Sequence, residues 1–317
     1  MAQPSPAKAP PLSGARAGRK IGLRRRLLPR WAMAWPALLW WGFFFFVPIG
    51  WIGYYSLGIK PADLSAGAVS LEDLSTSNYS AVFSEIFLRV FWVTVRTGGL
   101  GTLACALVGF PVAYALATYV SPRWRSLLLI LLVLPYWTSF LLRTFAWRII
   151  LAPEGTLSTA LRSLQILDQP LGLLDTNAAV QLGIIYNYLP LMILPMFVAL
   201  ERIDPALKQA SMDLGAGPAS TFFSVTLPLA APGILGGLLL TFILATSDYV
   251  VPAILGGARG LMVGNLVATQ VLASQNLPLG AAMANTLIGM LALVVIAAAL
   301  VLLALKAALR LWRGPSM

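Results

Sequence analysis

The sequence contains no histidine and only one cysteine among its 317 residues. Without histidine, the chain lacks the usual general base and the most common metal ligand. Cys105 lies inside an apolar run, and because it has no second cysteine to pair with, it is expected to be a small packing residue. No nucleophile and base stand out together elsewhere. We therefore expect neither a catalytic site nor a metal site in this chain.

Charged residues are also scarce. They make up only 10% of the sequence, whereas hydrophobic residues make up 59%. A soluble domain carries about 25% charged residues, so a chain this poor in charge could not cover a surface that faces water. Lipid must therefore be the main solvent, and the sequence predicts an all-α membrane protein.

Six apolar stretches are long enough to cross a bilayer, which takes roughly 20 apolar residues in a helix. They lie near residues 31–57, 87–119, 126–150, 178–200, 229–254 and 282–310. Several of them contain proline, which helices in a membrane bundle tolerate. The sequence thus predicts a membrane domain over residues 31–310, between a tail at 1–30 and a short cytoplasmic tail at 311–317.

The distribution of positive charge indicates how the chain is oriented. Residues 1–30 are basic and lack apolar periodicity, so we expect a disordered cytoplasmic tail. With this tail inside, the inner segments hold fifteen Lys and Arg residues and the outer loops hold three, which predicts that both termini are cytoplasmic. The apolar run at 31–57 is too long for a cleaved export signal, so an uncleaved first span is favoured. No folded basic face remains for nucleic acid.

The two longest outer loops differ in character. Residues 58–86 mix polar, acidic and apolar side chains, and we expect them to fold against the bundle or against a partner. Residues 151–177 alternate leucine with polar residues, which is compatible with a short helix. Neither loop is expected to form a soluble domain.

The longest cytoplasmic loop, residues 201–228, contains signals for a helix–turn–helix. Asp204 can cap a helix and Pro205 suits its first position, while Gly215 is placed to end it. A second amphipathic stretch covers 218–226, and Pro228 is expected to open the fifth span. Such an element can dock on a soluble partner, although an ordinary interfacial linker would show the same periodicity.

The spacing within this loop resembles the cytoplasmic "EAA" loop of ATP-binding-cassette (ABC) importer permeases. That pattern is Glu-Ala-Ala, three residues, Gly, nine residues, Ile, any residue, Leu-Pro. The matching positions here are Gln209, Ala210, Ser211, Gly215, Val225, Leu227 and Pro228. The resemblance implies that this loop grips an ATPase. Gln209 stands where the family has a glutamate, and Glu201 and Asp213 are the candidates to replace its charge.

Five further segments resemble the spermidine/putrescine-type branch of these permeases. They cover residues 134–147, 153–157, 201–207, 247–257 and 266–284. The resemblance implies the six-span type I importer fold in a bacterial inner membrane, surrounded by membrane lipid. It also implies three partners: an ABC ATPase dimer, a second permease subunit that is a different chain, and an extracytoplasmic solute-binding protein.

The energy for transport is expected to come from the ATPase partner. The chain has no Gly-x-x-x-x-Gly-Lys-Ser/Thr phosphate loop, so we expect it to bind no cofactor, while the partner uses ATP and magnesium.

Polar and aromatic residues within the spans are candidates for a solute path, because charge inside a membrane is costly. Asp248 beside Tyr249 could attract an organic ammonium through charge and cation–π attraction. The other candidates are Trp137, Arg143 and Tyr186, with Tyr136, Trp147, Asn187, Arg96 and Arg148 behind them. Internal ion pairs, snorkelling and ordinary packing are the alternatives.

The function predicted from these observations is import of a small cationic solute. Polyamines are the solute that the resemblance implies, and other amines, amino-acid-like compounds and opines stay open. The rival is an ion-coupled secondary transporter, which would need internal repeats and ionisable relays at mid-membrane. The sequence shows no clear repeat and few acids there.

Overall fold

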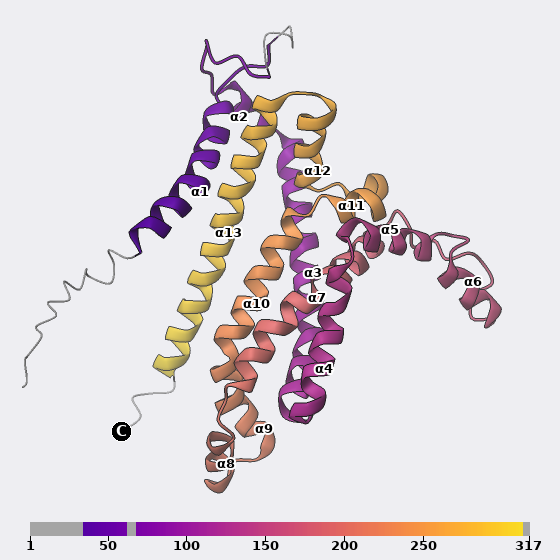
Figure 1. Cartoon of the computed structure of the whole chain (residues 1–317), viewed down its shortest axis with the longest axis vertical. Coiled ribbons are helices and arrows are strands. Elements are labelled where there is room, and N and C mark those ends of the chain that lie inside the picture. The colour runs from indigo at the N-terminus through magenta and orange to yellow at the C-terminus, as the bar shows by residue number, and fades with distance from the viewer. Residues whose placement is uncertain (1–33, 62–67, 313–317) are drawn as a thin grey trace, which may run out of the picture. The chain divides into compact units, whose positions relative to one another are not determined.

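The computed structural model describes residues 34–61 and 68–312. The predicted tail at 1–30 lies outside the described residues, as does most of the predicted tail at 311–317. Throughout the described ranges the regular elements are helices, and the one extended pairing is an isolated bridge between Ile59 and Ser70 (Figure 1). The all-α prediction is therefore confirmed for this part of the chain.

The chain divides at residue 49 into two compact units, of which the first contributes most of helix α1. This helix runs from Trp35 to Tyr55 and has no acidic residue in its first turn and no basic residue in its last. Its length and composition suit a membrane span. It corresponds to the first predicted span and ends two residues earlier.

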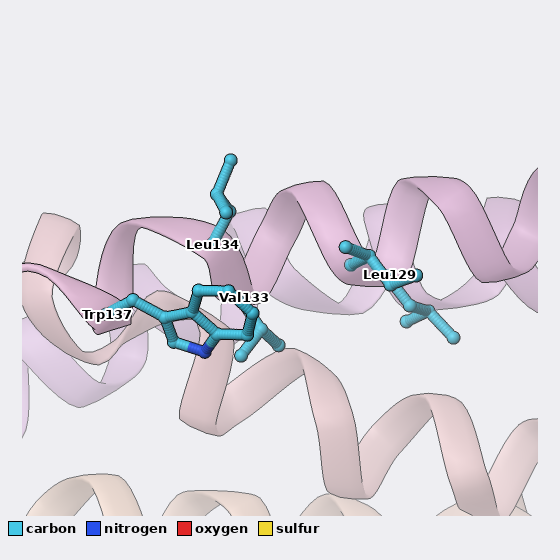
Figure 2. A pocket seen from close by; sticks show the side chains of 5 residues that line it. Leu129, Val133, Leu134 and Trp137 are labelled. Carbon is cyan, nitrogen blue, oxygen red and sulfur yellow. The ribbon is translucent and has the colours of Figure 1, made fainter.

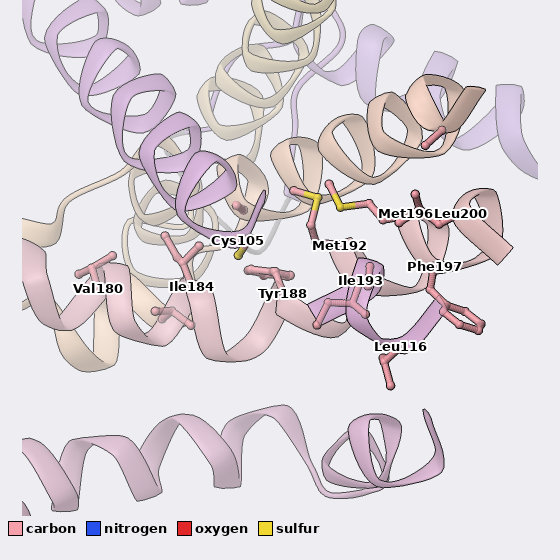
Figure 3. Packing of buried hydrophobic residues seen from close by; sticks show 14 of the residues in the cluster. Cys105, Leu116, Val180, Ile184, Tyr188, Met192, Ile193, Met196, Phe197 and Leu200 are labelled. Carbon is pink, nitrogen blue, oxygen red and sulfur yellow. The ribbon is translucent and has the colours of Figure 1, made fainter. Parts of the chain in front are cut away.

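The core of the second unit is formed by three long helices: α3 (Glu85–Thr118), α7 (Asn177–Glu201) and α10 (Leu227–Ser247). Helix α7 packs against both others, and Figure 3 shows Ile184, Met192 and Met196 projecting from it into the core. Glycines permit the close approach: a Cβ added at Gly109 of α3 would lie 3.3 Å from the Met192 side chain. Cys105 is fully buried in this core, as predicted.

A second apolar cluster joins α2 (Ser77–Val82) and α12 (Val263–Ala268) to α3 and to α13 (Leu277–Trp312). Val82 is fully buried there. Asn78 fixes the preceding chain by donating from Nδ2 to the carbonyls of Ser56 at 2.9 Å and Gly58 at 2.8 Å. The described part of the loop at 58–86, which leaves out residues 62–67, therefore folds against the bundle, one of the two outcomes predicted for the loop.

The third predicted span is not a continuous helix. Helix α4 (Pro122–Val133) passes into a 3₁₀ turn, η2 (Leu134–Trp137), and α5 (Phe140–Leu151) follows after two extended residues. The two halves of this broken span meet at 89°. Pro135 has no amide to donate to the preceding turn, and its carbonyl accepts a hydrogen bond from the Thr138 hydroxyl at 2.7 Å. The helix therefore ends there. In the described part of the chain, five helices are thus long and apolar enough to cross a membrane, or six if this bent pair counts as one.

Two shorter helices complete the outer connections. Helix α6 (Thr156–Ser163) confirms the short helix predicted within 151–177. Helix α11 (Val250–Leu255) follows α10 after a break at Asp248, so the predicted fifth span, 229–254, ends at Ser247 instead. A 3₁₀ turn at Gly257–Gly260 separates α11 from α12, and a π-helical turn at Thr269–Ala273 follows α12.

Candidate functional site

The loop between α7 and α10 begins with the predicted helix. Helix α8 runs from Pro205 to Asp213, and the carboxylate of Asp204 accepts a hydrogen bond from the Ala206 amide at 2.9 Å. Asp204 thereby satisfies one of the free amides of the first turn, and Pro205 occupies a position that needs no amide. The helix start predicted from these two residues is confirmed.

The end of α8 is also where the sequence predicts it. Gly215 has a φ of +88°, in the left-handed region that side chains disfavour. Its amide donates to the Met212 carbonyl at 2.9 Å, and the Ala216 amide donates to the Ser211 carbonyl at 3.2 Å. Gly215 therefore closes the helix in the manner of a C-terminal glycine cap.

The second half of the loop differs from the prediction. Helix α9 (Pro218–Thr221) continues through a π-helical turn, η3 (Phe222–Thr226), directly into α10. Leu227 and Pro228 therefore lie within one continuous helix, and Pro228 does not open the span. The π-helical turn explains why the helix continues through the proline. The Leu227 amide already bonds five residues back, to the Phe222 carbonyl, so the missing amide of Pro228 interrupts no α-helical hydrogen bonding there.

The outer surface of this loop is exposed and partly apolar. Helix α8 has no buried residue, and Leu214 is 89% exposed. The Ser211 and Thr221 hydroxyls are hydrogen-bonded at 3.1 Å, which links α8 to α9. Exposed side chains around this link include Gln209, Ala210, Asp213, Leu207, Met212 and Phe223. The residues of the predicted motif thus share one accessible end of the bundle, at α8 and α9 in Figure 1.

Glu201 is engaged elsewhere. It is the last residue of α7, and its carboxylate forms an ion pair with Arg125 of α4 at 2.8 Å. Its charge is therefore already neutralised by a neighbour, which leaves Asp213 as the exposed acid that could replace the charge missing at Gln209. Sequence reasoning counted Arg125 only as part of the inner positive charge, because its partner lies 76 residues away.

The predicted path residues lie toward the other end of α7 and α10. Asp248 is only 7% exposed and sits at the break between α10 and α11. One carboxylate oxygen accepts from the amides of Val250 at 2.8 Å and Val251 at 3.2 Å, and the other accepts from the Tyr188 hydroxyl at 3.0 Å. Asp248 therefore caps α11 and anchors it to α7.

Three consecutive residues of α7 connect this break to the broken span. Tyr188 binds Asp248, the Asn187 carbonyl accepts from the Tyr136 hydroxyl of η2, and Tyr186 packs edge-on against Trp147 of α5 at 5.4 Å. Sequence reasoning missed Tyr188, which has no local signal to distinguish it from other aromatic residues in a span.

Arg143 belongs to the same region. Its guanidinium lies over the Tyr136 ring, 4.5 Å from the centroid. Among the described residues, its Nε and Nη1 atoms and the Oδ1 atom of Asn187 are buried without hydrogen-bond partners. We call Tyr136, Arg143, Asn187, Tyr188 and Asp248 the polar cluster. It holds donors and an acceptor that a passing solute or water could satisfy.

The remaining path candidates, Trp137, Tyr249, Arg96 and Arg148, lie outside the polar cluster. Trp137 is 82% exposed and borders an open apolar hollow of about 310 Å³ on α4, shown in Figure 2. Tyr249 has an exposed side chain, and Arg96 is exposed on α3. Arg148 donates to the Ile254 carbonyl of α11 at 2.5 Å. Within 34–61 and 68–312 the one ion pair is that of Arg125 with Glu201, so internal pairing of Arg96, Arg143 or Arg148 is not seen.

No group of three or more potential metal ligands occurs in the described part of the chain.

Comparisons with known proteins place these features in a family. The model of the family described as "binding-protein-dependent transport system inner membrane component" matches residues 107–312. The spermidine/putrescine transport system permease protein PotB of Haemophilus influenzae is 38% identical over 222 residues, which are 70% of this chain and 77% of that protein. The PotB protein of Escherichia coli is 35% identical over 210 residues, covering 66% and 76%.

Two further comparisons agree with this placement. The inner membrane ABC transporter permease protein YdcU of Escherichia coli is 35% identical over 263 residues, which are 77% of this chain and 80% of YdcU. A chain in the crystal structure of a bacterial ABC transporter for import of the acidic polysaccharide alginate matches with a TM-score of 0.66 and 17% identity. It covers 84% of this chain and 91% of that chain, and it confirms the importer-permease fold alone.

Proposed function

The chain belongs to the family of binding-protein-dependent transport system inner membrane components, and from this premise we propose that it passes a polyamine through the membrane for an ABC importer. It is a multi-pass protein of the inner membrane and a permease subunit. The observation that carries the choice of solute is the 38% identity, over more than two thirds of the chain, to a permease named for spermidine and putrescine.

The polar cluster is the part of the structure that best supports a cationic solute. Asp248 is the one acidic residue in it and binds the Tyr188 hydroxyl, while Arg143, the one basic residue in it, already covers the Tyr136 ring. A cationic solute would therefore meet the cluster on the side of Asp248 and Tyr188. An organic ammonium is attracted both by a carboxylate and by the face of an aromatic ring. A solute that binds the Asp248 carboxylate would have to displace some of the three hydrogen bonds that it now accepts. The loss of those bonds weakens binding, so the cluster passes the solute without holding it tightly.

The proposed assembly contains more than this chain. We place six spans in the membrane, with the bent pair α4–α5 as the third and both termini in the cytoplasm. A second permease subunit, an ATPase dimer and an extracytoplasmic binding protein complete it. The alginate transporter supports a binding-protein partner, because one of its structures is described as a complex with a periplasmic protein. ATP and magnesium belong to the ATPase, and this chain performs no catalysis.

Coupling between the ATPase and the path is assigned to the α7–α10 loop. The exposed face of α8, with Gln209, Ala210 and Asp213, is the surface that would seat in a groove of the ATPase. Because α9 continues into α10 without a break, a displacement at this end reaches Asp248 through one helix. The bundle would then open alternately outward and inward around the polar cluster.

An ion-coupled secondary transporter is the weaker alternative. Its mechanism needs ionisable relays within the membrane, and the family to which the chain belongs depends on binding proteins instead.

Reconstitution tests the proposal. Proteoliposomes carrying this chain, its partner permease and the ATPase are supplied with the binding protein and labelled spermidine. We expect uptake that needs both ATP and the binding protein and that persists when a protonophore removes the proton gradient. Uptake that proceeds without ATP and stops with the protonophore would instead identify an ion-coupled carrier.

A further inference from the structure

Arg125 makes three side-chain hydrogen bonds and one cation–π contact. Its Nη1 donates to the Glu201 carboxylate at 2.8 Å, and its Nη2 donates to the carbonyls of Ala117 and Val120 at 3.2 Å each. The guanidinium also lies 5.9 Å from the ring centroid of Phe197. The Arg125 side chain is 19% exposed and that of Glu201 is 44% exposed, so water reaches the carboxylate, whereas the two bonds to the carbonyls are partly buried.

These contacts join three segments that are distant in sequence. Ala117 lies in the last turn of α3 and Val120 just beyond it, Arg125 lies in the first turn of α4, and Glu201 ends α7. The carbonyls at a helix end have no partner within the helix, so a guanidinium can bind them while it also binds a carboxylate. Arg125 thus fastens the α3–α4 corner to the end of α7.

The position of Glu201 gives this contact a role beyond packing. Three residues separate it from Pro205, where α8 begins, so a displacement of α8 can reach Glu201 along the chain, as it can reach α9 through the Ser211–Thr221 hydrogen bond. Helix α8 itself has no buried residue and is held by the Ser211–Thr221 hydrogen bond to α9 and by Lys208, which lies 5.9 Å from the Tyr114 ring centroid of α3. Helix α4 also has no fully buried residue, and its Leu129 and Leu132 pack only partly buried against the core, so Arg125 adds a polar contact to this apolar one.

We propose that Arg125 is a positioning residue that transmits the displacement of α8 to α4 and thereby to the broken span, which contributes Tyr136 and Arg143 to the polar cluster. This inference rests on the proposed function, because it assumes that an ATPase moves α8. Through Arg125 and Glu201, the ATPase would act on the third span in addition to α10. Without the contact, α7 and α8 could move while α4 stays in place.

The test compares variants in the complete transporter, reconstituted in proteoliposomes. Arg125→Gln removes the ion pair, Glu201→Gln removes it from the other side, and the double variant removes both partners. Arg125→Lys keeps the positive charge, but its single ammonium group cannot bind the carboxylate and both carbonyls at once as the guanidinium does. It serves as the conservative variant if Arg125→Gln fails to fold. Arg123→Gln, at an exposed position on the same helix, is the matched control. The readouts are spermidine taken up per ATP hydrolysed, the yield of complex and its melting temperature.

A purely structural role would lower the yield or the melting temperature and leave the uptake per ATP unchanged. We expect instead that Arg125→Gln and Glu201→Gln each lower uptake per ATP by roughly fivefold or more, the usual scale of coupling between sites. The double variant should lose no more than either single variant, because both act through one contact. Arg125→Lys should fall between, and Arg123→Gln should match the wild type.

Three results would overturn the inference: an unchanged uptake per ATP in both Gln variants, losses that add in the double variant, or an equal loss in Arg123→Gln. A wild-type complex whose ATP hydrolysis does not respond to the loaded binding protein would overturn the proposed function itself. The two failures are therefore distinguished by the wild-type measurement.

Discussion

We assign Asp248 a structural role and a proposed role in the solute path, which the sequence alone does not separate. An acidic residue near the end of an apolar run indicates a functional site, because burial of a charge is costly unless it is compensated. The structure shows the compensation: two amides of α11 and the Tyr188 hydroxyl bind the carboxylate. The carboxylate therefore holds the break between α10 and α11 in place at the position where it would meet a cation.

Two substitutions distinguish the cap from the charge. Asp248→Ala leaves the Tyr188 hydroxyl and the Val250 amide without a partner, and we expect it to destabilise the protein by about 1–3 kcal/mol. Asp248→Asn keeps an oxygen for the amides, so its stability should stay close to that of the wild type while spermidine uptake falls. Melting temperature in detergent and uptake in proteoliposomes measure the two effects. Normal uptake by the Asn variant would remove Asp248 from the path.

Tyr188 and Arg125 could not be predicted as functional residues from the sequence. Asp248 was identifiable because its charge is unusual in an apolar run, whereas Tyr188 and Arg125 were not. Each owes its role to a partner more than 50 residues away, 60 residues for Tyr188 and 76 for Arg125. Such pairs depend on how helices pack, and a single sequence carries no local signal for them.

At the scale of elements, the best predictions came from local chemistry. Asp204 and Pro205 start α8 and Gly215 ends it, because capping and left-handed backbone depend on a few adjacent residues. The same reasoning failed at Pro228, where a proline suggested a helix start. The π-helical turn before Pro228 tolerates the missing amide, and the position of such a turn could not be predicted from the local sequence.

Gly215 offers a test of the α8 end. Gly215→Pro fixes φ near −65° and removes the amide that binds the Met212 carbonyl, so the turn cannot form as it is. We expect the variant to insert in the membrane but to lose the stimulation of ATP hydrolysis by the loaded binding protein. Gly215→Asn is the control, because asparagine tolerates the left-handed region. Full stimulation in the Pro variant would refute a coupling role for this loop.

At the scale of the whole molecule, hydrophobicity located the long apolar helices. The core helices α3 and α7 begin within two residues of the predicted limits of the apolar runs. The 89° bend in the third span was not foreseen. Pro135 marks the place, but the direction and size of a bend depend on the neighbouring helices, which provide partners for the freed backbone groups.

That bend leaves a choice between six spans and five with a re-entrant pair, and labelling decides it. We start from Cys105→Ala, since Cys105 is the one cysteine of the chain and is fully buried. Ser121→Cys precedes α4 and Thr159→Cys lies in α6, and both positions are exposed. With six spans, a membrane-impermeant maleimide should label Thr159→Cys from outside and Ser121→Cys only after the membrane is opened. Labelling of both from the same side would mean that α4 and α5 turn back.

The continuous helix from Pro218 to Ser247 determines how far its ends move when it tilts. Thirty residues in one helix, at 1.5 Å each, give a rod about 45 Å long. If the helix pivots near its middle, a tilt of about 5° displaces the α9 end by about 2 Å and the end near Asp248 by about the same distance in the opposite direction. A slender, linear solute could therefore be admitted or refused by a rocking movement too small to unseat the packing of Met192 against its neighbours.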